Sequence, residues 1–248
     1  MVVVAQRVLV MLQEIAKSPD GIGVRELARN LGQSPSNIQK GLQALLAQEF
    51  VCQDGESKRY LLGPAAMQVG LAALSRFDLR NIGREYLESL AEDTGETAYL
   101  GVRYGDEAMY IEKVLGPSEV RVDAPIGARR PFNCTAMGKV LLAYMPEQEF
   151  YRLAGAGAFI QRTPSSIADP IALKEEIRRV RESGAAFDRE EYSVGVACVA
   201  APVFNHDGKL AGAVVLSGPA PRITSNQNIA QQVKTCAQNI SIRLGWQP

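Results

Sequence analysis

Residues 34–62, SPSNIQKGLQALLAQEFVCQDGESKRYLL, contain a helix pattern and then a turn pattern, and this order decides the fold of the N-terminal part of the chain. Ser34-Pro35 suits a helix start, because serine can cap free backbone N–H groups and proline fits the first turn. The apolar positions that follow recur at helical spacing: Ile38, Leu42, Leu45 and Leu46. Asp54-Gly55 is a strong hairpin signal between two extended arms. The stretch therefore predicts a helix followed by a β-hairpin.

Two more helices are predicted before this stretch. Their apolar stripes are Val4, Val8, Leu12 and Ile15, and then Val24, Leu27, Ala28 and Leu31. The punctuating residues 18–21, SPDG, separate them. Three helices with a short helix-turn-helix and a hairpin are the plan of a winged helix-turn-helix, which places its third helix in the major groove of DNA. We assign this mainly helical domain, with its β-hairpin wing, to residues 1–63.

The polar side of the third helix carries groups that can read a duplex. Asparagine and glutamine can pair with adenine, lysine can reach guanine or phosphate, and serine can bind phosphate. The candidate DNA contacts are Arg25, Ser34, Ser36, Asn37, Gln39 and Lys40, with Lys58 and Arg59 on the wing. Residues 1–63 hold seven basic and six acidic side chains, so the net charge of this domain gives only weak support for DNA binding. The alternative is that these are ordinary solvated positions, and the order of elements favours double-stranded operator DNA.

The connector, residues 64–77, opens on an almost wholly apolar segment. Between residues 65 and 74 only Gln68 is polar. A helix that is apolar on nearly all sides must be buried. We expect it to pack against its copy in a second subunit; docking on its own C-terminal domain is the alternative. A homodimer would also let two winged helices read two half-sites.

Residues 78–248 have a different pattern, with hairpins between helices. Strands are predicted at 97–102, 108–114, 120–122, 196–204 and 209–217, and helices at 136–145, 147–154, 170–183 and 225–244. Hairpins with helices before, between and after them indicate an α+β domain with an antiparallel sheet rather than a doubly wound parallel one.

The loop and helix start at residues 129–139, RRPFNCTAMGK, are the strongest candidate for a binding site. The first N–H groups of a helix lack intrahelical acceptors and lie at the positive end of its dipole, so they can hold a carboxylate. An ordinary helix start, capped by Thr135 and water, is the alternative. Downstream, Asp188, Cys198 and Ser217 add small polar groups to apolar strands, which is typical of a mostly apolar pocket with a few orienting contacts.

Composition excludes several classes of protein. The chain has 248 residues, of which 46% are hydrophobic and 22% charged, with a formal net charge of zero. Those fractions are typical of a soluble globular protein. Four cysteines far apart and a single histidine predict neither a zinc site nor a disulfide framework, and we expect no metal and no cofactor. No signal peptide or membrane-spanning run is found in the sequence, so we expect a cytoplasmic protein without a membrane partner.

Catalysis is the least favoured interpretation. Asp188, Cys198 and His206 are the residue types of a nucleophilic triad. However, His206 lies in the predicted turn at the hairpin tip and Cys198 is eight residues back on one arm, which separates them by more than about 20 Å. We therefore expect that the protein is not an enzyme and leave a cysteine-dependent hydrolase as the weakest alternative.

Three sequence blocks carry a family resemblance. They are 135–139 (TAMGK), 188–203 (DREEYSVGVACVAAPV) and 212–219 (GAVVLSGP). With the winged helix before them, in this order and spacing, the chain resembles the IclR family of bacterial transcriptional regulators along nearly its whole length. The resemblance implies a GAF-like C-terminal domain that binds a small metabolite, often an organic acid. It also implies dimers, often paired into tetramers. Repression and activation would use these same parts.

The resemblance also implies roles for residues of the pocket. The backbone amides at the helix start fall on Ala136 and Met137, the acidic contact on Asp188, the cysteine on Cys198 and the second of two strand hydroxyls on Ser217. Where the first hydroxyl is expected, this chain has Val215. The effector hypothesis is a small organic acid or carbonyl compound whose apolar body lies near Phe132, Met137 and Val215, which disfavours glyoxylate. A metabolite sensor that acts through protein partners is the alternative function.

Overall fold

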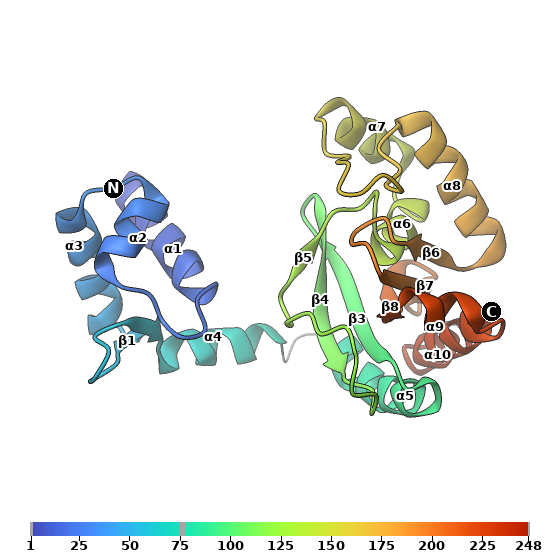
Figure 1. Ribbon diagram of the computed structural model, residues 1–248, viewed down its shortest axis with the longest axis horizontal. Coiled ribbons are helices and arrows are strands. Elements are labelled where there is room, and N and C mark those ends of the chain that lie inside the picture. The colour runs from blue at the N-terminus through green and yellow to red at the C-terminus, as the bar shows by residue number, and fades with distance from the viewer. Residues whose placement is uncertain (1, 75–77, 248) are drawn as a thin grey trace. The chain divides into compact units, whose positions relative to one another are not determined.

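The structure is a computed structural model that describes residues 2–74 and 78–247 (Figure 1). The chain divides into two compact units, Met1–Arg76 and Phe77–Pro248. The end of the connector that the sequence places at residue 77 lies outside the described residues.

The N-terminal unit is a three-helix domain with a small hairpin, which confirms the predicted winged helix-turn-helix. Its elements are α1 (Val2–Ala16), α2 (Val24–Leu31), α3 (Pro35–Ala47), β1 (Val51–Gln53), β2 (Tyr60–Leu62) and α4 (Pro64–Leu74). The buried residues come from all three predicted stripes and also include Met11, which the sequence pattern missed. Met11 packs on α3 at Gly41, where an added Cβ would lie 2.5 Å from its Sδ.

Local sequence explains the turn between α2 and α3. Gly32 ends α2 in the left-handed conformation, with φ +60°, which glycine adopts at little cost. Ser34 then caps α3 by accepting the N–H of Asn37 at 3.4 Å, and Pro35 occupies the first turn, as predicted. The turn therefore fixes where the exposed side of α3 begins.

The wing is shorter than the sequence indicates. Asp54 accepts hydrogen bonds from the Ser57 N–H at 2.7 Å and from the Ser57 hydroxyl at 2.6 Å. These bonds hold the residues after Asp54-Gly55 in a loop, so the second of the two predicted extended arms forms a strand only from Tyr60. Tyr60 also pairs with Ile22, which ties the wing to the segment before α2.

The C-terminal unit is an α+β domain around one antiparallel sheet, as predicted. Within the described residues the strand order is β5-β4-β3-β8-β7-β6. The strands are β3 (Thr97–Tyr104), β4 (Glu107–Val114), β5 (Arg129–Arg130), β6 (Ala186–Arg189), β7 (Val196–Phe204) and β8 (Leu210–Pro219). The helices are α5 (Asp78–Thr94), α6 (Ala136–Ala143), α7 (Glu147–Gly155), α8 (Pro170–Ser183), α9 (Ala220–Ser225) and α10 (Ile229–Arg243).

The sheet separates two hydrophobic cores (Figure 1). Helices α5 and α10 cover one face, where Val199, Val214 and Leu216 are buried. Helix α6 covers the other face and contacts α8 behind it. Because side chains alternate along a strand, Cys198 and Val215 point to the α6 face. The candidate pocket residues of the strands therefore share one face.

One predicted element of this domain is wrong, and another begins later than predicted. Residues 120–122 alternate like a strand but form none. The Val120 carbonyl accepts a hydrogen bond from Arg222, and the Val122 carbonyl accepts one from the Tyr99 hydroxyl, so side chains occupy the acceptors that a strand would use. The predicted C-terminal helix at 225–244 forms as α10, which begins at Ile229 because Ser225 belongs to α9 and the extended Asn226 ends that helix. No helix in the described parts of the chain has the length and apolarity to cross a membrane.

Candidate ligand pocket and nucleic-acid interface

The exposed side of α3 carries the predicted DNA contacts. Ser34, Ser36, Asn37, Gln39 and Lys40 are all exposed, while Ile38 between them is fully buried. This side therefore presents amide, hydroxyl and ammonium groups together, which are the groups that bind base edges and phosphates.

The basic residues among the predicted DNA contacts differ in whether their side chains already form ion pairs within the protein. Arg25, Lys40 and Lys58 are exposed and form no ion pair within the described residues. Arg59 does not project freely from the wing. Its Nε donates to the Gly21 carbonyl at 2.9 Å, and its Nη2 lies 3.0 Å from Glu26 Oε2. Arg59 thus links the wing to α2 in this structure, and its contact to the DNA backbone stays a prediction.

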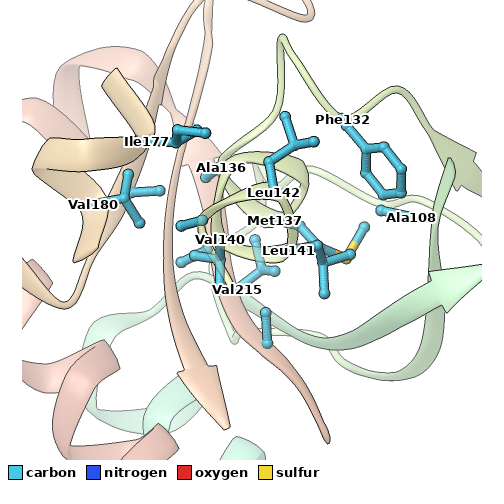
Figure 2. Packing of buried hydrophobic residues seen from close by; sticks show 14 of the residues in the cluster. Ala108, Phe132, Ala136, Met137, Val140, Leu141, Leu142, Ile177, Val180 and Val215 are labelled. Carbon is cyan, nitrogen blue, oxygen red and sulfur yellow. The ribbon is translucent and has the colours of Figure 1, made fainter. Parts of the chain in front are cut away.

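One cavity of about 240 Å³ collects six of the seven candidate effector contacts. They are Ala136, Met137, Asp188, Cys198, Val215 and Ser217. Phe132 does not line this cavity but packs into the hydrophobic core beside α6, as Figure 2 shows. The expected apolar contact at Phe132 is therefore wrong. A larger hollow of about 520 Å³ between α7 and α8 is lined by none of the candidates.

Strand register builds the polar wall of the cavity. Asp188 on β6 lies opposite Cys198 on β7, which lies opposite Ser217 on β8. Directly paired residues point to the same face of a sheet, so the three polar groups form one row. The Cys198 Sγ and the Ser217 Oγ are 3.1 Å apart. Three positions that are far apart in sequence are thereby brought together.

The start of α6 forms a second wall. The Thr135 hydroxyl accepts the Gly138 N–H at 3.1 Å and donates to the Pro131 carbonyl at 2.8 Å. An added Cβ at Gly138 would lie 2.3 Å from the Phe132 carbonyl oxygen, so only glycine permits this close approach. The cap leaves the N–H groups of Ala136 and Met137 without an acceptor among the described residues. Two donors at a helix start therefore adjoin the cavity.

Met137 is accommodated by a glycine on the sheet. An added Cβ at Gly101 of β3 would lie 1.9 Å from the Met137 Sδ, and the chain register shifts at this position. The side chain lies among Ala108, Leu141 and Val215 in the core (Figure 2). The sheet therefore makes room for the side chain of Met137.

Burial sets the protonation of the polar wall. Burial is the main cause that raises the pKa of Asp188 to about 6, against the lowering effect of the N–H groups of Glu191 and Tyr192. These N–H groups lie 2.7 Å and 3.3 Å from Asp188 Oδ1. The buried Lys139 ammonium of α6 lies 2.6 Å from Glu191, which ties α6 to the segment that follows β6.

The cysteine of the cavity is a thiol at neutral pH. Burial, together with the nearby charge of Asp188, raises the pKa of Cys198 to about 12. His206 lies in the exposed turn between β7 and β8, beside Asp207. A protonated thiol is a weak nucleophile, and no histidine is among the residues that line the cavity. The arrangement is suited to binding rather than to covalent chemistry.

Several residues of the cavity were missed by sequence reasoning. Tyr99 and Tyr110 stack on neighbouring strands, with ring centroids 4.4 Å apart. The Tyr99 hydroxyl accepts the Ala124 N–H at 2.8 Å, which fixes residues 122–125 in the cavity wall. Arg130 and Tyr192 complete it. The alternation of side chains along β3 and β4 predicts which residues of each strand lie on the same face of the sheet as Tyr99 or Tyr110. It does not show which face borders a cavity.

The chain matches two family models along most of its length. One described as "Bacterial transcriptional regulator IclR C-terminal" matches residues 71–242. Another described as "IclR helix-turn-helix domain" matches residues 4–55.

Curated proteins and solved structures give the same result. XynR, an HTH-type transcriptional regulator of Escherichia coli K12, is 30% identical over 97% of this chain and 96% of its own length. AllR, an HTH-type transcriptional repressor of Klebsiella pneumoniae, is 31% identical over 98% of this chain and 90% of its own. The crystal structure of Thermotoga maritima IclR matches with a TM-score of 0.78 and 31% identity, covering 99% of this chain and 100% of that one. An IclR regulator of Alicyclobacillus acidocaldarius matches with a TM-score of 0.83 and 28% identity, over 98% and 96% of the two chains.

Proposed function

This chain belongs to the IclR family of bacterial transcriptional regulators, and from this premise we propose that α3 binds operator DNA and that a small organic acid in the C-terminal cavity changes the affinity for it. The observation that carries the proposal is the convergence of Asp188, Cys198, Ser217 and the α6 amides on one cavity. The curated AllR relatives are repressors, and repression of transcription in the cytoplasm is the outcome we propose.

The DNA contacts we propose are on two elements. Asn37, Gln39 and Lys40 on the exposed side of α3 would face base edges in the major groove. Ser34, Ser36 and Arg25 would bind phosphates near the helix start, and Lys58 would contact the flanking backbone from the wing. Arg59 is omitted, because its guanidinium is bound within its own domain.

The chemistry of the cavity favours an acid. The N–H groups of Ala136 and Met137 lie at the positive end of α6 and can donate to a carboxylate. Ser217 and Cys198 can orient a second polar atom, while Val215 and the two stacked tyrosines present apolar surface to the body of the molecule. Replacement of a strand hydroxyl by Val215 makes this cavity less suited to a very small, highly polar acid such as glyoxylate.

We propose that two copies pair through α4. Met67, Val69 and Leu71 on this helix are 62%, 59% and 54% exposed in the single chain. Several large apolar side chains exposed close together on one helix are typical of an interaction surface. A dimer lets two copies of α3 read two half-sites, and ligand would act by favouring one arrangement of the domains.

The test of DNA recognition is Lys40→Ala in the full chain. Loss of one ammonium group on α3 is expected to weaken operator binding by about tenfold or more. Lys17→Ala is the matched control, because Lys17 is exposed at the end of α1 and paired with Glu14. DNase footprinting upstream of the gene, with calorimetry of acid binding, checks both functions. Loss of acid binding in Lys40→Ala would show misfolding, and unchanged operator affinity would contradict the assignment of α3.

The salt dependence of DNA binding distinguishes the proposed regulator from a sensor that acts through protein partners. Binding through phosphates must weaken linearly on a log–log plot as salt rises. A chain that gives no footprint at low salt would favour the protein-partner alternative.

A further inference from the structure

Arg130 lies in the cavity wall within a stack of rings and guanidinium groups. Its guanidinium carbon is 5.5 Å from the centroid of the Tyr110 ring and 4.9 Å from that of Tyr192. The guanidinium of Arg162 is 4.3 Å from the same Tyr192 ring. Stacking on aromatic faces holds an arginine in place while its edge N–H groups stay available to an acceptor.

Arg130 has no carboxylate partner in the described parts of the chain. Within the described residues its guanidinium donates one hydrogen bond, to the neighbouring Arg129 carbonyl at 2.9 Å. The carboxylates of the cavity wall are engaged elsewhere: Asp123 with Lys113 at 2.5 Å, and Asp188 with two backbone N–H groups. Arg129, by contrast, lies near Glu107, at 3.9 Å. The half-buried guanidinium of Arg130 therefore has no ion-pair partner among the described residues, and a ligand carboxylate could supply one.

We propose that Arg130 is a specificity-determining residue and that the effector is a short dicarboxylate, with one carboxylate at the α6 amides and the other on Arg130. This rests on the proposed function. The planar guanidinium matches the two oxygens of a carboxylate, and such charge-assisted pairs are stronger than neutral hydrogen bonds. Monocarboxylates of the same length would leave Arg130 unpaired.

The sheet order sets the width of the cavity between Arg130 and the polar wall. Ser217 lies on β8 and Arg130 on β5, with β3 and β4 between them. Strands about 4.8 Å apart give roughly 14 Å between the two backbones in a flat sheet, and the arginine side chain spans only part of that distance. Tyr99 and Tyr110, on the intervening strands, form an apolar floor that suits a short run of methylene groups. A cavity of about 240 Å³ limits the molecule to a small one.

The test is calorimetric titration of the full chain with three matched pairs of acids: succinate and butyrate, glutarate and pentanoate, adipate and hexanoate. The wild-type chain is expected to bind the dicarboxylate of at least one pair about tenfold more tightly or better. Arg130→Gln should reduce that preference to about twofold or less, and Arg130→Lys should restore only part of it, because an ammonium group lacks the planar fork. Arg129→Gln is the matched control outside the cavity and should keep the full preference.

Two results would overturn the proposal. One is equal or tighter binding of the monocarboxylates by the wild-type chain; the other is an unchanged preference in Arg130→Gln with an unchanged unfolding temperature. In either case acid binding would persist, so the proposed effector function would survive. A wild-type chain that binds none of the six acids at millimolar concentration would contradict the dicarboxylate proposal and the acid-responsive function together.

Discussion

At the scale of single residues, the cavity depends on polar groups that burial has altered. Asp188 is 2% exposed and its pKa is raised to about 6, chiefly because burial disfavours the carboxylate. The charged groups that act on it are Glu191 and Lys139. A raised pKa means that the folded chain binds this proton more tightly than the unfolded chain does. The charge of Asp188 therefore costs stability once the carboxyl group is ionised.

Asp188→Asn is expected to change the dependence of stability on pH. In the wild-type chain this group lowers the free energy of unfolding as pH rises from its ordinary pKa of 3.8 to about 6, by about 2 to 3 kcal/mol in total. Asparagine keeps an oxygen for the N–H groups of Glu191 and Tyr192 but has no charge, so the variant should lack that decline. Urea unfolding at a series of pH values measures how the free energy of unfolding of each chain changes with pH. Glu92→Gln, an exposed control, should follow the wild-type profile; an identical decline in Asp188→Asn would refute the assignment.

The role of a residue could be predicted where its chemical type suits the site and the local sequence also fixes its position on a strand. Cys198 and Ser217 fall on the two arms of one hairpin, so the sequence places them near each other, and the register pairs them directly. The bonds of Arg59 to Gly21 and Glu26 and the packing of Phe132 beside α6 could not be predicted, because they are long-range contacts. Arg130 was missed for the same reason, since its environment includes Tyr192, which is distant in sequence.

At the scale of elements, the wing and α2 form a linked pair. Arg59 joins them through the Gly21 carbonyl and Glu26, while Lys58 is exposed and has a left-handed φ of +58°. Neighbouring basic residues therefore have different structural roles, although the sequence presents them as equivalents.

Arg59→Met and Lys58→Met are expected to differ accordingly. Arg59→Met should cost about 0.5 to 1 kcal/mol, because the ion pair is half exposed, and should speed hydrogen exchange at the Ile22 and Tyr60 amides, which pair with each other. Lys58→Met should leave exchange unchanged and reduce the salt slope of DNA binding by about one. Hydrogen exchange of the full chain, with binding measured at several salt concentrations, separates the two. Faster exchange in Lys58→Met and none in Arg59→Met would reverse the assignments.

Long periodic elements could be predicted from sequence, and short ones could not. The stripe of α3 and the β7–β8 hairpin have local signals, a cap and a turn, that agree with their final environment. The two-residue strand β5 exists only because Arg129 and Arg130 pair with β4, and residues 120–122 fail to form a strand because Tyr99 and Arg222 bind their carbonyls. These partners are distant in sequence, so the local sequence pattern cannot show whether such a short segment pairs as a strand.

At the scale of the whole molecule, α4 is a helix of apolar sequence that its own unit leaves largely exposed. Met67 and Leu71 are one helical turn apart, on one side of the helix, and both are more than half exposed. Removing such side chains from water in a dimer stabilises the pair by about 1.5 kcal/mol or more for each fully buried one.

Met67→Lys with Leu71→Lys is expected to convert a dimer into a monomer and to weaken operator binding, because two half-sites are then no longer read together. Gln68→Lys is the matched control on the same exposed helix and should remain dimeric. Sedimentation velocity gives the mass of each. A monomeric wild-type chain, or a double variant that stays dimeric, would exclude α4 as the interface.

The most direct test of the account is the operator affinity of the full chain with and without the tightest-binding of the six acids. Fluorescence anisotropy with a labelled upstream fragment is expected to show a change of about fivefold or more at saturating acid, and the operator should change the acid affinity by the same factor. Ser217→Ala should weaken acid binding and shift this response to higher acid concentration. An acid that occupies the cavity and leaves operator affinity within about twofold would contradict the account, because binding in the cavity and reading of DNA would then be uncoupled.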